Sequence, residues 1–296
     1  MTFKIHLILV ICLICPFYSL ANENPGAQLT TIRYFQTDQR YHYRIELLKL
    51  ALTKTQGEWG EFQLVPDERR LTQSRGSVLL EKNQGIDIAS FPTTKDREKR
   101  FIPIRMPILQ GMLGCRVLLI NQYKQEAFSK VHSLESLQKN YTAGFGNQWA
   151  DMKILESNQL PVQGVTQYER LFEMLHNNRF DYFPRGINEA WLEIEKYQGQ
   201  FKYLAVETSM ALYYPIYVYY FVPHNKPTLA ARIKQGLKIA LQDGSFKALF
   251  KKHHQALIMK ASLDNRRIFL LDNPFLPPIE ESPKILWWLP NNLPTF

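Results

Sequence analysis

Hydrophobic and polar positions alternate between two periods along the chain from residue 30 onward. Tyr41, Ile45 and Leu48 recur at helical spacing, whereas the runs on either side are short and apolar, as in strands. The segments read as strand, helix, strand, helix and strand at 30–35, 41–53, 61–65, 71–82 and 86–89. This order predicts an open sheet that is covered by helices.

The same order of elements returns in the middle of the chain, between two strongly apolar runs at 115–121 and 213–222. Pro215 favours an edge or entry position for the second of these strands. We predict a capped helical turn at 133–137, strands at 141–145, 162–165 and 180–183, and helices that end at 157, 177 and 197. A two-part helix is expected at 229–253, interrupted at Asp243-Gly244.

The two apolar strands bracket residues 122–212, which indicates a second domain inserted into the first through a pair of crossing segments. We expect a first lobe from 22–118 and 216–296, and a second lobe from 119–215. Bending at 115–121 and 213–222 would open and close a ligand cleft between the lobes. The Pro- and Asn-rich tail from Leu263 is expected to wrap the surface of the first lobe.

The first 21 residues have the three parts of a secretory signal peptide. Lys4 supplies the positive start, residues 5–17 are apolar apart from His6, and Ser19-Leu20-Ala21 fits the cleavage pattern. An uncleaved anchor is the alternative, but the apolar run is shorter than the roughly 20 residues that a membrane span needs. We therefore expect 1–21 to be removed and the mature protein to reside in the periplasm.

The composition is that of a packed globular protein, because 45% of the 296 residues are hydrophobic and 13% are aromatic. The formal net charge is +9, but the basic residues are scattered without a nucleic-acid-binding motif, so we expect no nucleic-acid partner. Cys115 is the one cysteine beyond the signal segment, which excludes an intrachain disulfide in the mature chain. It is expected to be a buried small hydrophobe.

Motifs for catalysis or metal binding are absent from the sequence. There is no Ser-x-x-Lys or Gly-x-Ser-x-Gly motif. His253-His254 has no third ligand at useful spacing, so we interpret it as a solvated pair rather than a metal site. Five glutamates are expected on solvated helix faces: Glu169, Glu173, Glu189, Glu193 and Glu195. We expect no cofactor, no metal and no enzymatic activity.

Residues 85–107 carry the strongest candidate for ligand chemistry. A short strand pattern at 86–88 opens into the small-residue loop 89–94 and then into a basic run that includes Arg97. Loops beyond strand ends expose backbone N–H groups, and Arg97 could grip a carboxylate with two parallel hydrogen bonds. The alternative is a simple turn followed by a solvated arginine.

Four motifs over roughly residues 29–255 resemble the type II periplasmic solute-binding proteins, and the nearest branch is family 3, the amino-acid-type binders of ABC uptake systems. The motifs are, in chain order, Gly85-x-Asp87…Thr94-x-x-Arg97…Phe101…Pro107, Leu134-Glu135-Ser136-Leu137 with Tyr141-Thr142-Ala143-Gly144, Leu171-Phe172-Glu173-Met174-Leu175 with Asn178-Arg179-Phe180-Asp181, and Ile233-x-x-Gly236-Leu237 with Asp243-Gly244-Ser245-Phe246. The resemblance implies an α/β fold of two lobes, each a mixed open sheet flanked by helices, with a double-strand hinge.

The resemblance also implies a ligand site. In the family, the loop after the third strand holds the ligand's carboxylate, a second-lobe loop at a helix N-terminus contacts the same anion, and an aromatic near the first strand packs on the ligand. Carried over by position, the ligand-binding residues are Phe35, Tyr41, Ser90, Pro92, Arg97, Asn147, Gln148 and Trp149, with Arg185 as a further candidate.

Two departures from the family pattern concern the ligand. Pro92 stands where a hydroxyl is expected and loses one donor. The acidic residue that would accept the ligand's ammonium is replaced by Pro184-Arg185-Gly186. If Arg185 faces the cleft, the ligand is more anionic than a simple amino acid. Alternatively, Arg185 pairs with Glu189 one helical turn later.

These features favour a monomeric periplasmic protein that captures a small carboxylate-bearing ligand, anionic or amino-acid-like, by hinge closure. Its partner would be an ABC transporter permease or a membrane sensor. A ligand-free or sensory adaptor of the same fold is the alternative, and a dehydratase-like periplasmic enzyme is a weaker one.

Overall fold

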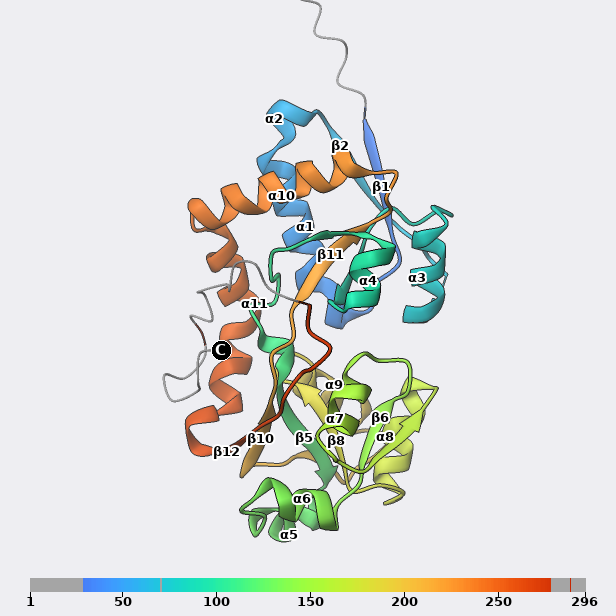
Figure 1. Ribbon diagram of the computed structural model, residues 1–296. Coiled ribbons are helices and arrows are strands. Elements are labelled where there is room, and N and C mark those ends of the chain that lie inside the picture. Colours follow the sequence, from blue (N-terminus) through green and yellow to red (C-terminus); the bar gives the residue numbers. More distant parts are fainter. Residues whose placement is uncertain (1–28, 70, 278–287, 289–296) are drawn as a thin grey trace, which may run out of the picture.

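The computed structural model describes residues 29–69, 71–277 and 288, and these form two α/β lobes arranged end to end (Figure 1). The predicted signal peptide at 1–21 lies outside the described residues. None of the described helices is long and apolar enough to cross a lipid bilayer.

The first lobe contains two small sheets and the helices that cover them. Strands β1 (Thr30–Tyr34) and β2 (Phe62–Pro66) pair in parallel, and helices α1 (His42–Lys54) and α2 (Gln56–Trp59) connect them. Strand β11 (Val218–Val222) pairs antiparallel with β3 (Ala89–Pro92) and β4 (Ile102–Ile104). The remaining helices are α3 (Gln73–Glu81), α4 (Lys95–Arg100) and α10 (Pro227–Gln242).

The second lobe is built on a seven-stranded sheet with β12-β10-β5-β8-β6-β7 in order and β9 beside β5. Every residue of β5 (Cys115–Asn121) is buried, which explains why five of its seven residues are apolar. The other strands are β6 (Ala143–Gly146), β7 (Val162–Val165), β8 (Tyr182–Gly186), β9 (Leu204–Val206), β10 (Met210–Tyr213) and β12 (Arg267–Leu270). The helices are α5 (Gln125–Ser129), α6 (Leu134–Asn140), α7 (Asp151–Ser157), α8 (Tyr168–His176) and α9 (Ala190–Tyr197).

The predicted single strand at 213–222 is wrong, because the segment forms two strands in different sheets. Strand β10 pairs with β5 in the second lobe, and β11 pairs with β3 and β4 in the first. Residues 214–217 between them carry Pro215, which has no N–H to donate to a sheet. The chain therefore changes lobe at this proline.

The second crossing lies just before β5 and not within it. The N–H of Tyr214 donates to the carbonyl of Gly114 at 3.2 Å, so the two crossing segments run side by side. A Cβ atom at Gly114 would lie 2.0 Å from the carbonyl oxygen of Tyr214, which only glycine avoids. All of β5 belongs to the second-lobe sheet, so the expected boundary at residue 118 falls inside a strand.

The C-terminal segment departs from its expected place on the first lobe. Helix α11 (Ser245–Ala261) packs on α1 in the first lobe, but β12 then pairs in parallel with β10 in the second-lobe sheet. Figure 1 shows α11 running beside both lobes toward β12. Beyond β12, the side chain of Asn273 donates to the carbonyl of Pro215 at 2.8 Å, and the indole N–H of Trp288 donates to that of Gln110 at 2.7 Å. The tail therefore contacts the crossing segments.

Two further expectations need correction. The loop predicted at 89–94 is mostly strand β3, because Ser90 stands opposite Tyr220 in register with β11. Glu189, Glu193 and His254 are buried and not solvated. Cys115 is buried, as predicted, and burial raises the pKa of its thiol to about 12.

Candidate functional site

A cavity of about 880 Å³ lies between the two lobes. Its first-lobe wall comes from parts of 35–44 and 69–73 with Pro92, and its second-lobe wall from parts of 146–151 and 165–171 with Arg185, Glu189 and Lys196. Leu113 and Arg116 complete the lining near the crossing segments. A cavity of this size fits a small molecule, since ligand pockets measure roughly 300–1,000 Å³.

In the first-lobe wall, the side-chain amide of Gln36 makes three hydrogen bonds with one residue of β3. The amide oxygen of Gln36 accepts hydrogen bonds from the N–H of Ser90 at 2.6 Å and from its hydroxyl at 2.9 Å. The amide nitrogen donates to the carbonyl of Ser90 at 2.8 Å. Ser90 itself is buried and is not among the residues that line the cavity.

Arg97 lies beside the cavity and is not part of its lining. The Thr94 hydroxyl caps helix α4 by accepting a hydrogen bond from the N–H of Arg97. This bond fixes the backbone position from which the Arg97 side chain extends. Its Nη1 donates to the carbonyl of Pro92 at 2.6 Å, and the guanidinium lies 5.0 Å from the centroid of the Phe91 ring. Burial lowers the pKa of Arg97 to about 10, and Asp151 compensates only in part.

Two more arginines of the first lobe face the cavity. Arg44, on the first turn of α1, is 4% exposed and donates through Nη1 to the Ser90 hydroxyl at 3.3 Å. Its Nε has no hydrogen-bond partner, and burial lowers its pKa. Within the described part of the chain, no carboxylate lies within ion-pair distance of Arg44. Arg40, two residues after Asp38, places its Nε 3.4 Å from the Asp38 carboxylate.

In the second-lobe wall, Arg185 of β8 is enclosed by carboxylates and aromatic rings. Both of its hydrogen bonds to Glu193 are short, at 2.6 and 2.5 Å, and Glu189 lies 3.1 Å away. The rings of Trp149 and Phe183 each lie 4.9 Å from the guanidinium. Arg185 therefore faces the cavity and also pairs with Glu189. The two alternatives that the sequence left open for Arg185 are both observed.

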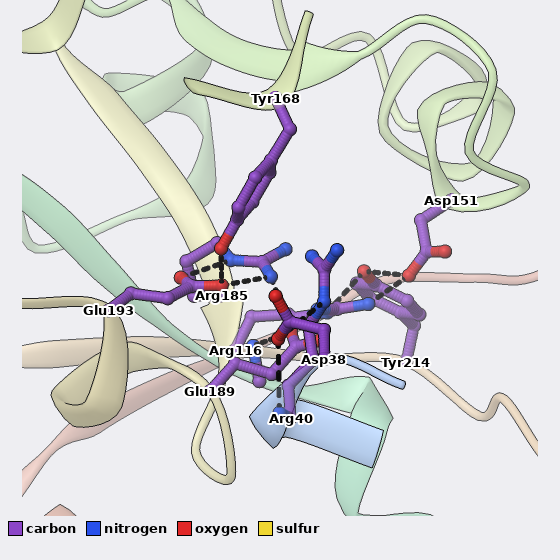
Figure 2. A network of polar contacts seen from close by, with 10 residues as sticks. Asp38, Arg40, Arg116, Asp151, Tyr168, Arg185, Glu189, Glu193 and Tyr214 are labelled. Atoms are coloured by element: carbon purple, nitrogen blue, oxygen red, sulfur yellow. Dashed lines mark hydrogen bonds and ion pairs between the residues drawn. The ribbon is translucent and has the colours of Figure 1, made fainter. Parts of the chain in front are cut away.

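A second ionic group lies around Arg116 of β5. Its guanidinium forms a buried ion pair with Asp151 and lies 3.3 Å from Glu189. The Tyr214 hydroxyl accepts from Arg116 at 2.8 Å and donates to Asp151 at 2.8 Å. Figure 2 shows Glu189 between this group and the Arg185–Glu193 pair. Tyr214 of one crossing segment and Arg116, two residues after Gly114 of the other, thus join a network that continues into the second-lobe wall.

The network keeps Glu189 ionised. Burial alone would raise the pKa of Glu189, but the guanidinium groups of Arg185 and Arg116, with those of Arg40 and Arg44, lower it to about 2. Two of these four arginines belong to the first lobe, so the charge of Glu189 attracts residues across the cleft.

Cationic side chains exceed anionic ones in the cavity wall. The lining contains six cationic residues, Arg40, Arg44, Arg69, Arg116, Arg185 and Lys196. It contains four acidic residues, Asp38, Asp151, Glu169 and Glu189. Asp67 and Glu193, outside the lining, pair with Arg69 and Arg185, so the lining cation that has no carboxylate partner among the described residues is Arg44. Its uncancelled charge in a low-dielectric wall favours a guest with negative charge.

Three side-chain contacts bridge the lobes across the cavity. The guanidinium of Arg40 lies 4.3 Å from the centroid of the Tyr168 ring. The Ser74 hydroxyl donates to the amide oxygen of Gln148 at 2.7 Å, and Lys196 lies 4.0 Å from Asp38. The arrangement of the lobes is therefore a closed one, held by weak contacts.

Most of the residues proposed from the sequence converge on this cavity. Those that line it are Phe35, Tyr41, Pro92, Asn147, Gln148, Trp149 and Arg185, whereas Ser90 and Arg97 stand behind the wall. Their roles toward a ligand stay predictions. The structure adds lining residues that the sequence did not single out: Gln36, Arg40, Arg44, Arg116, Asp151 and Tyr168. It also adds Glu189, which the sequence suggested only as a solvated glutamate or as a partner of Arg185.

One of the missed residues carried a signal. Arg116 is a charged residue inside the apolar run at 115–121, and a charge in a buried strand needs a partner. Arg40 and Arg44 stand four residues apart next to Tyr41, a pattern that is equally typical of a solvated helix face. Among the described residues, no group of three or more His, Cys, Asp or Glu side chains is placed to hold a metal ion.

Neither a family model nor a curated protein matches this chain. Solved structures do match. The GluR0 ligand-binding core from Nostoc punctiforme, in complex with (L)-glutamate, is 16% identical with a TM-score of 0.51 over 76% of this chain and 98% of that chain. The arginine-, lysine-, histidine-binding protein ArtJ from Geobacillus stearothermophilus is 15% identical with a TM-score of 0.53 over 77% and 96%.

A histidine kinase sensor domain with similarity to periplasmic binding proteins is 15% identical, with a TM-score of 0.53 over 77% of this chain and 97% of that chain. At these identities the likeness establishes the fold alone. The two-lobe α/β fold of periplasmic binding proteins, predicted from the sequence motifs, is thereby confirmed.

Proposed function

We propose that this protein is an exported solute-binding protein that captures a small anion-bearing molecule between its lobes. The observation that carries the proposal is Arg44, a buried guanidinium that faces the cavity without a carboxylate partner among the described residues. An uncompensated buried charge is costly, and an anionic guest would offset that cost.

The fold supports the size and kind of guest. The GluR0 core holds (L)-glutamate, and an ancestral protein of the same fold holds arginine. In this chain Trp149, Phe35 and Tyr41 would supply the apolar contact surface, and Asn147 and Gln148 the polar contacts. Binding, not catalysis, is the proposed activity.

Arg97 is proposed to act at the edge of the same site. Its pKa is lowered to about 10 by burial, so a nearby anion would stabilise its charged form. Its Nη1 is held by the carbonyl of Pro92, a residue of the cavity wall, which places the guanidinium directly behind that wall. Asp151 already acts on it electrostatically across the cleft.

The partner of the loaded protein is proposed to be a membrane permease of an ABC transporter or a membrane sensor. Solved structures of both kinds share the fold, namely an amino acid ABC transporter's binding protein and a histidine kinase sensor domain. The predicted signal peptide at 1–21 supports a periplasmic location as part of this proposal, and the protein is proposed to act there as a monomer.

Native mass spectrometry of the purified mature protein tests the proposal directly, together with a thermal-shift screen of amino acids, organic acids and short peptides. A co-purified or stabilising anion is expected. Arg97→Ala should then weaken binding at least tenfold, while Arg179→Ala, which changes an exposed arginine outside the cavity, should not. A screen without any binding compound would favour the ligand-free adaptor.

A further inference from the structure

The two buried carboxylates of the cavity lining, those of Asp151 and Glu189, are each engaged through one oxygen by the chain's own arginines. The Asp151 carboxylate is held by Arg116 and by the Tyr214 hydroxyl. One oxygen of Glu189 faces Arg185 at 3.1 Å and Arg116 at 3.3 Å, and it accepts the N–H of Gly186 at 3.1 Å. Both oxygens of Glu193, behind the wall, are bonded to Arg185.

The two acidic residues that remain lie toward the cavity mouth. Asp38 is paired with Arg40 and lies 4.0 Å from Lys196. Glu169 is exposed, so water screens its charge. A ligand ammonium inside the cavity would therefore find no buried carboxylate that is free of an arginine.

The cationic side of the cavity is less well compensated. Arg44 is buried, and its Nε lacks any hydrogen-bond partner. The Nε of Arg40 likewise makes no hydrogen bond, but the Asp38 carboxylate 3.4 Å away forms an ion pair with it, so Arg44 is the less compensated of the two arginines. Since these arginines stand on one wall, four residues apart, they present two guanidinium groups to the same guest.

We infer that the ligand is a small molecule with two or more negative charges and no ammonium group, such as a dicarboxylate or a phosphate monoester. The inference rests on the proposed function and narrows it, because it excludes the zwitterionic α-amino acids. Arg44 and Arg40 would hold the anionic groups of the ligand. The carboxylates of the second lobe are paired with arginines, so they would repel the ligand's second negative charge less than unpaired carboxylates would.

The position of Gln36 agrees with this assignment. Its amide occupies the N–H, the hydroxyl and the carbonyl of Ser90. A ligand carboxylate cannot use these groups unless it displaces Gln36. The anionic group of the ligand is therefore expected to bind to the guanidinium groups. Such a site selects ligands by their negative charge more than by the shape of an amino acid.

Matched pairs of compounds test the inference by isothermal titration calorimetry on the mature wild-type protein. Succinate is compared with L-aspartate, and glutarate with L-glutamate, because each pair differs by one ammonium group. Glycerol phosphate is the probe for phosphate monoesters. Glutamine and arginine serve as the neutral and cationic amino acids.

At least tenfold tighter binding of succinate or glutarate than of its amino analogue supports the inference, and so does binding of glycerol phosphate. Equal or tighter binding of aspartate or glutamate, or binding of glutamine or arginine, overturns it and leaves the proposed function standing. Failure of every compound, with no co-purified ligand, overturns both.

A pair of variants locates the anion. Arg44→Gln removes one positive charge and should weaken binding of the best dianion at least tenfold. Arg179→Gln removes the same charge from an exposed site and should leave the affinity unchanged. Unaltered affinity in Arg44→Gln would contradict the assignment of Arg44 as an anion-binding residue. If that variant does not fold, the comparison of compounds on the wild-type protein still tests the inference.

Discussion

Gln36 and Ser90 are joined by three hydrogen bonds, so that a side-chain amide of the first lobe satisfies every backbone and side-chain polar group of Ser90. The resemblance to the solute-binding family places a ligand carboxylate at this point of the chain. Here the chain supplies its own oxygen instead, and Ser90 becomes a support for the wall. The proposed ligand site is accordingly placed at Arg44, whose Nη1 lies 3.3 Å from the Ser90 hydroxyl.

Replacing Gln36 should cost stability. Gln36→Ala leaves the buried N–H and hydroxyl of Ser90 without an acceptor, and unsatisfied buried polar groups cost about 1–3 kcal/mol. Urea unfolding followed by circular dichroism measures the change. Gln255→Ala, at an exposed position of α11, should alter stability by less than about 0.5 kcal/mol. A loss of less than about 0.5 kcal/mol in Gln36→Ala would show that water replaces the amide.

A side chain at Gly114 should disturb the crossing segments. The added Cβ of Gly114→Ala would lie 2.0 Å from the carbonyl oxygen of Tyr214, so the backbone must move. We expect a loss of about 2–4 kcal/mol by the magnitudes of severe overpacking. Gly57→Ala is the matched control, because nothing lies within 4 Å of its Cβ and alanine favours helix α2. Equal stability of both variants would contradict the close contact.

The stability of the protein should fall in mild acid because of His254. This side chain is buried between Tyr43 and Phe250, and neither ring nitrogen has a hydrogen-bond partner. Burial, with smaller contributions from His253 and Arg44, lowers its pKa to about 3. The unfolded chain binds this proton below about pH 6.5, so the neutral imidazole contributes full stability above that pH and loses it as the pH falls toward 3.

His254→Leu should remove this dependence. Between pH 7 and pH 5 the wild-type protein should lose about 2 kcal/mol more than the variant, since each pH unit in the window costs up to about 1.4 kcal/mol. Urea midpoints at both pH values measure the difference. Exposed His132→Gln serves as the control and should follow the wild type. Parallel curves for wild type and His254→Leu would mean that the buried imidazole does not govern the acid response.

The contact between Arg40 and Tyr168 should favour the closed form. Its ring-to-guanidinium distance of 4.3 Å is that of a cation–π pair, worth about 0.5–1 kcal/mol when partly exposed. Arg40→Ala should therefore increase the open fraction of the ligand-free protein about two- to fivefold. Single-molecule energy transfer between labels on the two lobes reports that fraction. Lys153→Ala, at an exposed position of α7, is the control and should leave the distribution of open and closed forms unchanged. An unchanged distribution in Arg40→Ala would show that the contact does not stabilise the closed form.

Local periodicity was sufficient to predict most elements. Strands β5 and β7 have the predicted bounds, and α8 ends one residue from its predicted end. The error at 213–222 has a physical cause, because both halves of this run are buried and the apolar pattern does not record that they belong to different sheets. Strand β12 was missed because its four residues stand in a polar tail and its partner β10 lies far away in sequence.

The candidate site was predictable only in part for a related reason. The loop at 146–149 begins at the end of strand β6, and Arg185 lies near the end of β8, at positions where sequence patterns indicate ligand contacts. The meaning of Arg116 depends instead on Asp151 and Tyr214, which are 35 and 98 residues away. No short window of sequence contains such a network, and the charge balance of the cavity depends on it.

Strand β12 gives the chain a third passage between the lobes, in addition to those beside Gly114 and Pro215. Two adjacent tethers permit twist as well as bend, whereas a third one at a distance resists torsion about the molecule's long axis. Motion of the lobes is then restricted to a shallow rocking about a fixed line. On the proposed function, a guest would have to pass the contact between Asp38 and Lys196, whose charged groups lie 4.0 Å apart in this closed arrangement.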